Sequence, residues 1–154
     1  MIRVVLLDSG PLGLLCNSRG GAASTDCNRW LNQIQQYGVK VVISAIADFE
    51  VRRELVLAGL MPSVVRLDRL MNLCIYMPVT QEVVAKASEL WSDARRGGQP
   101  TADPLALDAD VLIAAQAQCL EDAGFKVIVA TFNAVHIGRY VRALSWTEIK
   151  AEEI

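Results

Sequence analysis

The sequence alternates between two patterns of apolar and polar positions. One is a short unbroken run of apolar residues, which is typical of a strand buried on both faces. The other is an apolar residue at every third or fourth position, which is typical of a helix that buries one face. Because the two patterns alternate along the chain, they predict a three-layer α/β/α fold with a central, mostly parallel sheet. The predicted strands lie at 3–7, 40–43, 74–77, 126–131 and 143–145.

Turn-forming and capping residues place the boundaries of the helices. Ser44 and Thr80 are N-cap candidates for the helices that follow them. Asp8-Ser9-Gly10-Pro11 is typical of a turn, here one that ends the first strand and leads into a glycine-rich loop, and 95–100 is the clearest loop in the chain. The predicted helices lie at about 27–37, from 44 to 58, from 62 onward, from 80 to the loop at 95, at 108–121 and at 135–140.

The composition fits a single domain over residues 1–154. A hydrophobic content of 53% with 21% charged residues excludes a disordered chain, although the apolar share is slightly high, as a covered surface would explain. The net charge of -2 gives no indication of nucleic-acid binding through bulk charge. No apolar run approaches the roughly 18 residues of a membrane span. We therefore expect a cytoplasmic protein without membrane contact.

The four cysteines lie far apart in the chain, with no C-x-x-C pair and no neighbouring histidine. This spacing excludes a zinc knuckle and disfavours a disulfide framework. We interpret them as small core residues. They are Cys16, Cys27, Cys74 and Cys119.

Oxygen-bearing side chains follow three of the predicted strands or begin the helix at 108–121. Since the carboxyl ends of parallel strands share one edge, we expect these side chains to gather there. Several ionised carboxylates in one pocket need a counter-charge, and oxygen ligands without Cys or His favour Mg²⁺ or Mn²⁺. A metal-activated water makes phosphodiester hydrolysis the chemistry that follows. The residues are Asp8, Glu50, Asp108, Asp110, Thr131 and Asn133.

Four segments carry a resemblance to a known family. They are Leu7-Asp8-Ser9, then Ser44 with Glu50-Val51-Arg52-Arg53-Glu54-Leu55, then Asp110-Val111-Leu112-Ile113-Ala114-Ala115, and Thr131-Phe132-Asn133. Together, in this order and at this spacing, they resemble the PIN domain. They are most similar to the ribonuclease toxins called VapC, the toxic half of type II toxin–antitoxin pairs. The resemblance spans nearly the whole chain.

Carried over residue by residue, the resemblance implies that Asp8, Glu50 and Asp110 are the catalytic acids that hold Mg²⁺ or Mn²⁺. Family members often have a fourth acid in the Thr-x-Asp or Thr-x-Asn region, where this sequence has Asn133, an oxygen donor without charge. Asp108 could supply the missing charge as a further metal ligand, although a helix N-cap is the more usual explanation of an Asp at this position.

Other polar residues are candidates for supporting roles. Ser9 and Thr131, with Asn133, are expected to orient water or carboxylate by hydrogen bonds around the metal. Arg95 and Arg96 are substrate-binding candidates because an arginine suits phosphate contacts, with a solvated surface as the ordinary alternative. Asp48 and Glu54 compete with Glu50 for the second acid position, Arg53 and Glu54 fit a helix-surface pair, and His136 fits ordinary surface.

The sequence therefore predicts a Mg²⁺- or Mn²⁺-dependent endoribonuclease. The resemblance implies the toxin of a toxin–antitoxin pair, with an RNA substrate, a homodimer and a cognate antitoxin whose peptide blocks the site. The alternative is a PIN-like interaction module with weak or no nuclease activity, which the uncharged Asn133 favours. An aspartyl phosphotransferase is excluded because Gly10 stands where such enzymes need a second Asp, and P-loop and G-x-G-x-x-G patterns are absent.

Overall fold

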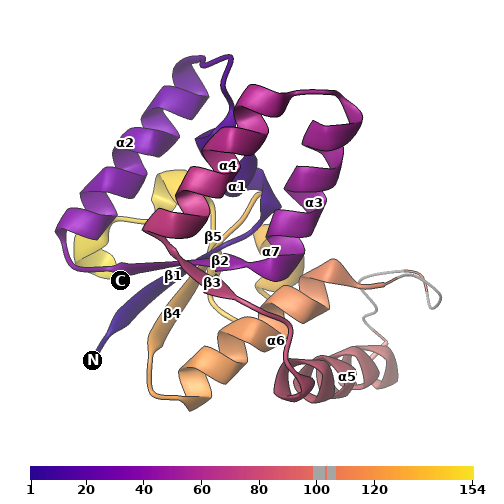
Figure 1. Ribbon diagram of the computed structural model, residues 1–154. Helices are drawn as coiled ribbons and strands as arrows, with labels where there is room; N and C mark the ends of the chain where they lie inside the picture. Colours follow the sequence, from indigo (N-terminus) through magenta and orange to yellow (C-terminus); the bar gives the residue numbers. More distant parts are fainter. Residues whose placement is uncertain (99–102, 104–106) are drawn as a thin grey trace.

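In the described part of the chain, five strands form one sheet in which every neighbouring pair is parallel (Figure 1). The computed structural model describes residues 1–98, 103 and 107–154. The strand order is β3-β2-β1-β4-β5, so β1 is central. The strands are β1 (Arg3–Leu7), β2 (Lys40–Ser44), β3 (Ile75–Met77), β4 (Lys126–Ala130) and β5 (Ala143–Leu144).

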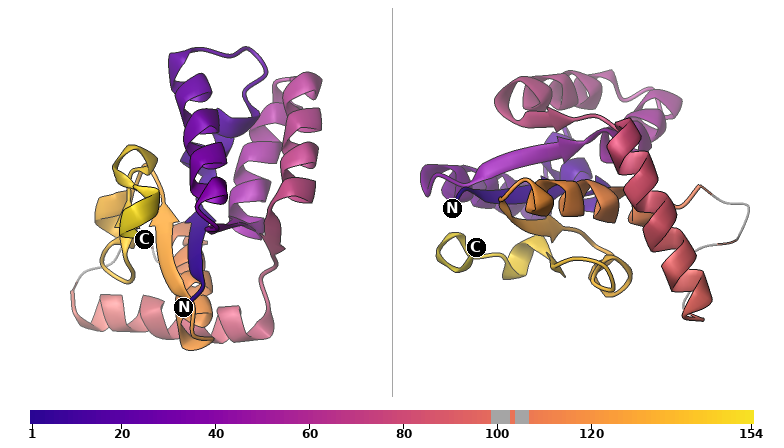
Figure 2. Two further views of the ribbon diagram at one scale, coloured as in Figure 1. Left: turned by 90° about the vertical axis from the view of Figure 1, so that its left-hand side faces the viewer. Right: turned by 90° about the horizontal axis from the view of Figure 1, so that it is seen from below.

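Helices cover both faces of this sheet (Figure 2). Successive strand residues point to opposite faces, so Val5 and Leu7 of β1 pack on one helical layer while Val4 and Leu6 pack on the other. The helices are α1 (Ser9–Cys16), α2 (Ala22–Gln36), α3 (Ala45–Leu57), α4 (Met61–Leu73), α5 (Gln81–Arg96), α6 (Ala109–Asp122) and α7 (Ala134–Ile137), with 3₁₀ turns at Trp146–Glu148 and Ala151–Glu153.

The two layers contain different helices. Helices α1 to α4 and the C-terminal residues pack on the face of Val5, and α6 and α7 pack on the face of Val4. Helix α5 lies outside α6, where Val83 and Ala87 meet Val111 and Ala115 (Figure 2). The predicted three-layer α/β/α fold is confirmed, and the sheet is wholly rather than mostly parallel.

The turn predicted directly after β1 is wrong, because α1 begins at once, and the glycine-rich loop is confined to residues 17–21 before α2. Asp8 is the N-cap of α1: the side chain accepts a hydrogen bond from the backbone N–H of Ser9. Pro11 lies in the first turn, where the N–H that proline lacks would have no partner within the helix. A Gly-Pro pair that is typical of a turn is therefore compatible with the start of this helix.

Helix α2 begins five residues earlier than predicted, at Ala22 instead of Cys27. Its N-cap is Gly21, which has a positive φ of 109° and provides no side-chain cap. Ser24 lies inside the helix and donates a hydrogen bond to the Leu14 carbonyl at 2.6 Å. This hydroxyl joins α2 to α1 instead of starting the helix.

Arg95 and Arg96 lie in the last turn of α5, so their prediction as loop residues is also wrong. Basic side chains at a helix C-terminus interact favourably with its dipole. Gly97 and Gly98 follow the helix, and the rest of the predicted loop, Gln99 and Pro100, lies outside the described residues.

The cysteines are free thiols, of which Cys16, Cys27 and Cys119 are buried and Cys74 is half-buried. Burial raises the pKa of the Cys16 thiol to about 11 and that of Cys27 to about 12. These thiols are therefore protonated and unreactive at neutral pH. No helix in the described ranges has the length and apolar character needed to cross a bilayer.

Candidate active site

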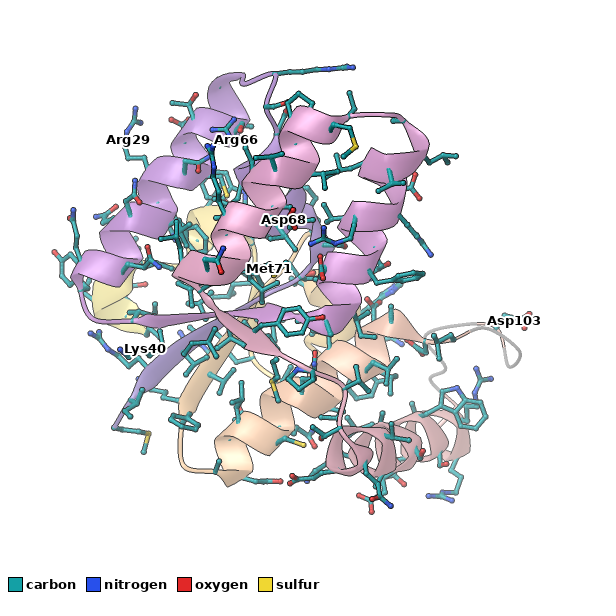
Figure 3. All side chains as sticks on the ribbon, viewed as in Figure 1. Arg29, Lys40, Arg66, Asp68, Met71 and Asp103 are labelled. Atoms are coloured by element: carbon teal, nitrogen blue, oxygen red, sulfur yellow. The ribbon has the colours of Figure 1, made fainter. Side chains whose placement is uncertain are left out.

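The site lies where the chain leaves the sheet in two directions. The helix after β1 packs on one face, and the helix after the neighbouring strand β4 packs on the other. The two connections diverge and leave a crevice outside the carboxyl ends of these strands, which is where open α/β sheets commonly bind ligands. Asp8 follows β1 and Thr131 follows β4, so both lie at this point. Lys40, at the start of β2, marks the opposite end of the sheet (Figure 3).

Asp8 is buried and held by two hydrogen bonds. Its Oδ1 accepts from the Ser9 backbone N–H at 2.7 Å, and its Oδ2 accepts from the Thr131 hydroxyl at 2.7 Å. The side chain is 6% exposed, so both partners restrict its rotation in a confined space. Each carboxylate oxygen keeps further lone-pair capacity for a ligand.

A short chain of hydrogen bonds leads from Asp8 to Asp110. The Thr131 hydroxyl that donates to Asp8 accepts from the Asn133 backbone N–H at 2.8 Å. The Asn133 side-chain amide then donates to Asp110 Oδ2 at 2.6 Å. Asn133, at the position where the resemblance in sequence implies a fourth acid, is thus a hydrogen-bond donor to Asp110.

The pKa values of Glu50 and Asp110 are both raised, as expected for buried acids that lie close to other acids. Burial raises the pKa of Glu50, and the charges of Asp8 and Asp110 raise it further against the opposing effect of Arg53. Burial also raises the pKa of Asp110, as do the charges of Asp8 and Asp108. The structure therefore brings Asp8, Glu50 and Asp110 within mutual electrostatic range, from β1, α3 and α6.

A buried polar pair joins the two helices that carry Glu50 and Asp110. The Ser44 hydroxyl caps α3 by accepting from the Ile46 N–H at 3.1 Å, and it donates to the Gln116 side-chain oxygen at 2.5 Å. Gln116 on α6 also donates to the backbone carbonyls of Met77 and Pro78. Ser44 and Gln116 are both fully buried, so they fix α6 against the ends of β2 and β3.

Asp108 is the N-cap of α6, where its Oδ1 accepts from the Val111 N–H at 3.1 Å. The sequence left two roles open for Asp108, a helix N-cap and a metal ligand, and the structure shows the N-cap. Its charge still reaches Asp110, whose pKa it raises. Ligation by Asp108 stays a prediction.

His136 is a site residue that the sequence analysis treated as ordinary surface. Its Nδ1 lies 3.7 Å from Asp110 Oδ2, and its side chain is 44% exposed. Against the effects of burial, Asp8 and Asp108, the imidazole lowers the pKa of Asp110, as does the hydrogen bond from Asn133. No spacing in the sequence indicated this approach, because Asn133 lies outside the helix predicted at 135–140.

The arginines near the acids have different partners. Arg52 spans α3 and α4 by pairing with Asp48 at 3.0 Å and Asp68 at 2.8 Å (Figure 3), which engages Asp48, a competitor for the second acid position. Arg53 pairs with Glu54 at 3.5 Å, as expected for a helix-surface pair.

Arg95 and Arg96 have described contacts within α5. The Arg95 guanidinium lies 4.2 Å from the centre of the Trp91 ring, and Arg96 pairs with Asp93 at 2.7 Å. Phosphate binding by these two arginines stays a prediction.

The donor set suits a hard divalent cation. Asp8, Glu50 and Asp110 offer only carboxylate oxygens, which Mg²⁺ and Mn²⁺ prefer. Burial and neighbouring negative charges raise the pKa of Glu50 and of Asp110, and a cation would offset both effects. Within residues 1–98, 103 and 107–154, however, no three acid, His or Cys side chains are already arranged to hold one ion directly. Mg²⁺ usually keeps several waters, so ligation here would rely on waters or on rotation of the carboxylates.

A hollow of about 380 Å³ lies beside the acids, between α1 and α3. Glu50 and Arg53 line it from α3, and Ser9, Gly10 and Gly13 line it from α1. The site therefore has open space that is lined by two acids, Glu50 and Glu54, and by one basic residue, Arg53.

A scan against models of known protein families finds no match for this chain, and a search of curated protein sequences finds none either. Solved structures, in contrast, match nearly its whole length. A chain of VapBC2 from Rickettsia felis, a complex bound to a DNA fragment from their promoter, has a TM-score of 0.68 at 14% sequence identity. That match covers 93% of this chain and 98% of the other.

Two further solved structures agree. A chain of VapBC-1 from nontypeable Haemophilus influenzae has a TM-score of 0.64 at 16% identity and covers 94% of this chain and 99% of its own. VapC20 from Mycobacterium tuberculosis, a toxin that cleaves the sarcin–ricin loop, has a TM-score of 0.57 at 15% identity, with coverage of 89% and 96%. At these identities the likeness shows the fold. This chain therefore has a VapC-like α/β/α fold, as the resemblance in sequence implied.

Proposed function

We propose that this protein is a Mg²⁺- or Mn²⁺-dependent endoribonuclease that acts as the toxin of a toxin–antitoxin pair. The observation that carries the proposal is the convergence of Asp8, Glu50 and Asp110 at one edge of the sheet. Beyond the effect of burial, the charges of Asp8 and Asp110 raise the pKa of Glu50, and the charge of Asp8 raises that of Asp110. The fold shared with chains of VapBC complexes and with a ribosomal-loop-cleaving toxin supports the same function.

The described residues explain what the protein itself contributes. A bound divalent ion supplies a water of lowered pKa and offsets the charge on the phosphate. Asp8 is oriented for this role by Ser9 and Thr131, and Asp110 is oriented by Asn133. Arg53, which lines the adjoining hollow, offers a cation to a neighbouring phosphate.

The proposal includes a cognate antitoxin and a homodimer. Three of the matching structures are VapBC complexes, in which a partner accompanies the matching chain. Exposed apolar side chains on α3 and α4, such as Leu57 and Leu73, are consistent with a covered surface. Size determination by light scattering, alone and with the product of an adjacent short gene, tests both partners.

One alternative is favoured by specific observations. Asn133 brings no charge to the fourth position, and the described acids do not form a ready coordination shell. Both features suit a PIN-like interaction module with weak or no nuclease activity. Titration with Mn²⁺ distinguishes the two, because a nuclease site should bind the ion at up to millimolar concentration.

The deciding experiment compares RNA cleavage by the wild type with that by Asp8→Asn. Replacing Asp8 removes its charge but keeps an oxygen acceptor for Ser9 and Thr131. We expect kcat/KM to fall by more than about a hundredfold, because loss of outer partners of a metal ligand alone often costs about 10- to 100-fold.

A matched control is Asp26→Asn, the same change on α2. Asp26 pairs with Arg29, which projects from the outer side of α2 (Figure 3), and both side chains are exposed. This variant should cleave like the wild type. Equal cleavage by the wild type and Asp8→Asn would show a contaminating nuclease and refute the proposed function.

A further inference from the structure

Phe132 presents a large aromatic surface to solvent between the two residues that bond Asp8 and Asp110. Its side chain is 65% exposed, although it lies between Thr131, which bonds Asp8, and Asn133, which bonds Asp110. The residues on either side of Phe132 are therefore those that orient two of the acids. An exposed phenylalanine at such a place carries a cost in water unless another molecule covers it.

The local structure holds this ring in a defined position. The Asn133 N–H donates to the Thr131 hydroxyl at 2.8 Å, which closes a tight turn around Phe132. The ring packs against the backbone of Gly10, where an added Cβ would lie 2.5 to 2.8 Å from three ring carbons. Only glycine leaves room for this approach. The ring is thus fixed against α1 while most of its surface is open.

We propose that Phe132 is a stacking platform for one nucleobase of the RNA next to the scissile phosphate. This inference rests on the proposed function and names the substrate class: RNA with an unstacked base at the cut, in a single strand or loop. Bases in an A-form duplex are stacked on one another and unavailable to such a ring.

The neighbouring surface suits the rest of the strand. Gly10 contacts the Phe132 ring and also lines the hollow of about 380 Å³ that Glu50 and Arg53 border. A strand with one base on Phe132 would therefore reach a basic side chain and the acids over a short distance. A protein side chain could also cover an aromatic ring, but continuity with the acids favours RNA.

The test uses a short single-stranded RNA whose cut site is mapped with the wild type. Substrates with one abasic nucleotide at each successive position are then compared. We expect an abasic nucleotide at one position next to the cut to lower kcat/KM by about 5- to 100-fold. This is the effect expected when one base–aromatic stack is lost. Phe132→Leu should cleave the intact RNA more slowly than the wild type does, by a similar factor. This variant should cleave the abasic RNA no more slowly than the intact RNA.

Three further variants make the result specific to the ring. Phe132→Trp keeps an aromatic face, so it should keep the abasic penalty, which is the factor by which the abasic nucleotide lowers kcat/KM. Gly10→Ala should displace the ring and weaken that penalty, because the new methyl group takes its space. Tyr37→Leu removes another exposed aromatic residue, which precedes β2 at the opposite end of the sheet, and should change neither rate nor penalty. Thermal melts should show Phe132→Leu as folded, since the ring is largely exposed.

Binding provides a readout independent of cleavage. In the Asp8→Asn background the RNA stays intact, and Phe132→Leu should weaken its affinity by a similar factor. An abasic penalty of full size in Phe132→Leu, or unchanged affinity, overturns the stacking proposal and assigns the ring to a protein contact. Cleavage that does not depend on Asp8 refutes the nuclease instead, and the binding comparison still decides the role of Phe132.

Discussion

The Thr131 hydroxyl donates a hydrogen bond to Asp8 Oδ2 at 2.7 Å, across 123 positions of the chain. Both residues are buried, and they end the neighbouring parallel strands β4 and β1. The same hydroxyl accepts from the Asn133 N–H, so one atom links the two strand ends to the Asn133–Asp110 contact. The orientation of two proposed catalytic acids therefore depends on one side-chain oxygen.

Replacing Thr131 by valine tests this dependence. The variant keeps the side-chain shape but removes the donor to Asp8 Oδ2 and the acceptor of the Asn133 N–H, while the Ser9 N–H still bonds Asp8 Oδ1. We expect the free energy of unfolding to fall by about 1–3 kcal/mol and RNA cleavage to fall with it, as measured by urea denaturation and initial rates. Thr131→Ser keeps the hydroxyl and should retain most of both. Equal losses in the two variants would contradict this role.

Replacing Asn133 by aspartate restores the charge that VapC-type sequences often have at this position. Asn133 donates to Asp110 at 2.6 Å, so the new carboxylate would face Asp110 as a like charge. In chelator at neutral pH we expect the variant to lose about 1–3 kcal/mol of unfolding free energy. Added Mn²⁺ should reverse this loss and raise the Tm by more than in the wild type.

Asn133→Ala provides the comparison for that experiment. It removes the same hydrogen bond without adding charge, so Mn²⁺ should not restore its stability. A Tm increase in Mn²⁺ that is no larger for Asn133→Asp than for the wild type would mean that no ion binds beside Asp110.

Much of the fold follows from local patterns in the sequence. The buried strands are unbroken apolar runs such as Val41-Val42-Ile43, and α3 and α5 begin at the predicted caps Ser44 and Thr80. Helix α1 was missed because Gly10 and Pro11 are typical of turns, while its formation depends on the cap by Asp8 and on the position of Pro11 in the first turn. Local propensity alone does not contain that information.

Some features of the candidate site were predictable from the sequence and others were not. Asp8 and Thr131 were predictable neighbours, because parallel strands place their carboxyl ends at one edge. The approach of His136 to Asp110 and the exposure of Phe132 were not predictable, since both depend on how the short helix α7 packs against the end of α6. Contacts of this kind are set by tertiary packing and not by sequence spacing.

The acids should make stability depend on pH in a particular direction. The pKa of Asp110 is raised above its ordinary 3.8, and that of Glu50 above its ordinary 4.5. The folded protein thus holds these protons to higher pH than the unfolded chain does. Their contribution to stability is fully present below the ordinary pKa values and is lost as pH rises through the raised ones.

Thermal melts in chelator measure this effect as the difference in Tm between the wild type and variants in which one acid is replaced by its amide. Relative to Glu50→Gln and Asp110→Asn, the wild type should lose Tm as the pH rises above the ordinary pKa values of the two acids and through their raised ones. At neutral pH the amide variants should be the more stable proteins, and saturating Mn²⁺ should remove their advantage. Parallel Tm curves for the wild type and both variants would show that the acids do not crowd one another.

The last prediction concerns the buried pair Ser44–Gln116, which holds the helices of Glu50 and Asp110 together. Gln116→Leu leaves the Ser44 hydroxyl without its acceptor and the Met77 and Pro78 carbonyls without their donor. We expect a loss of about 2–4 kcal/mol in urea denaturation, since each unsatisfied buried group costs about 1–3 kcal/mol. The helices that carry two acids would also lose their link, so kcat/KM should fall in the folded variant.

A double-mutant cycle separates this link from simple loss of packing. Ser44→Ala and Gln116→Leu together should cost less than the sum of the single changes by at least about 0.5 kcal/mol, because they share one hydrogen bond. Gln118→Leu is the matched control on the same helix, where the amide donates only to the Tyr140 carbonyl at 3.2 Å. Its cost should add to that of Ser44→Ala. Additive costs for Ser44 and Gln116 as well would mean that the two residues stabilise the fold independently and do not couple α3 to α6.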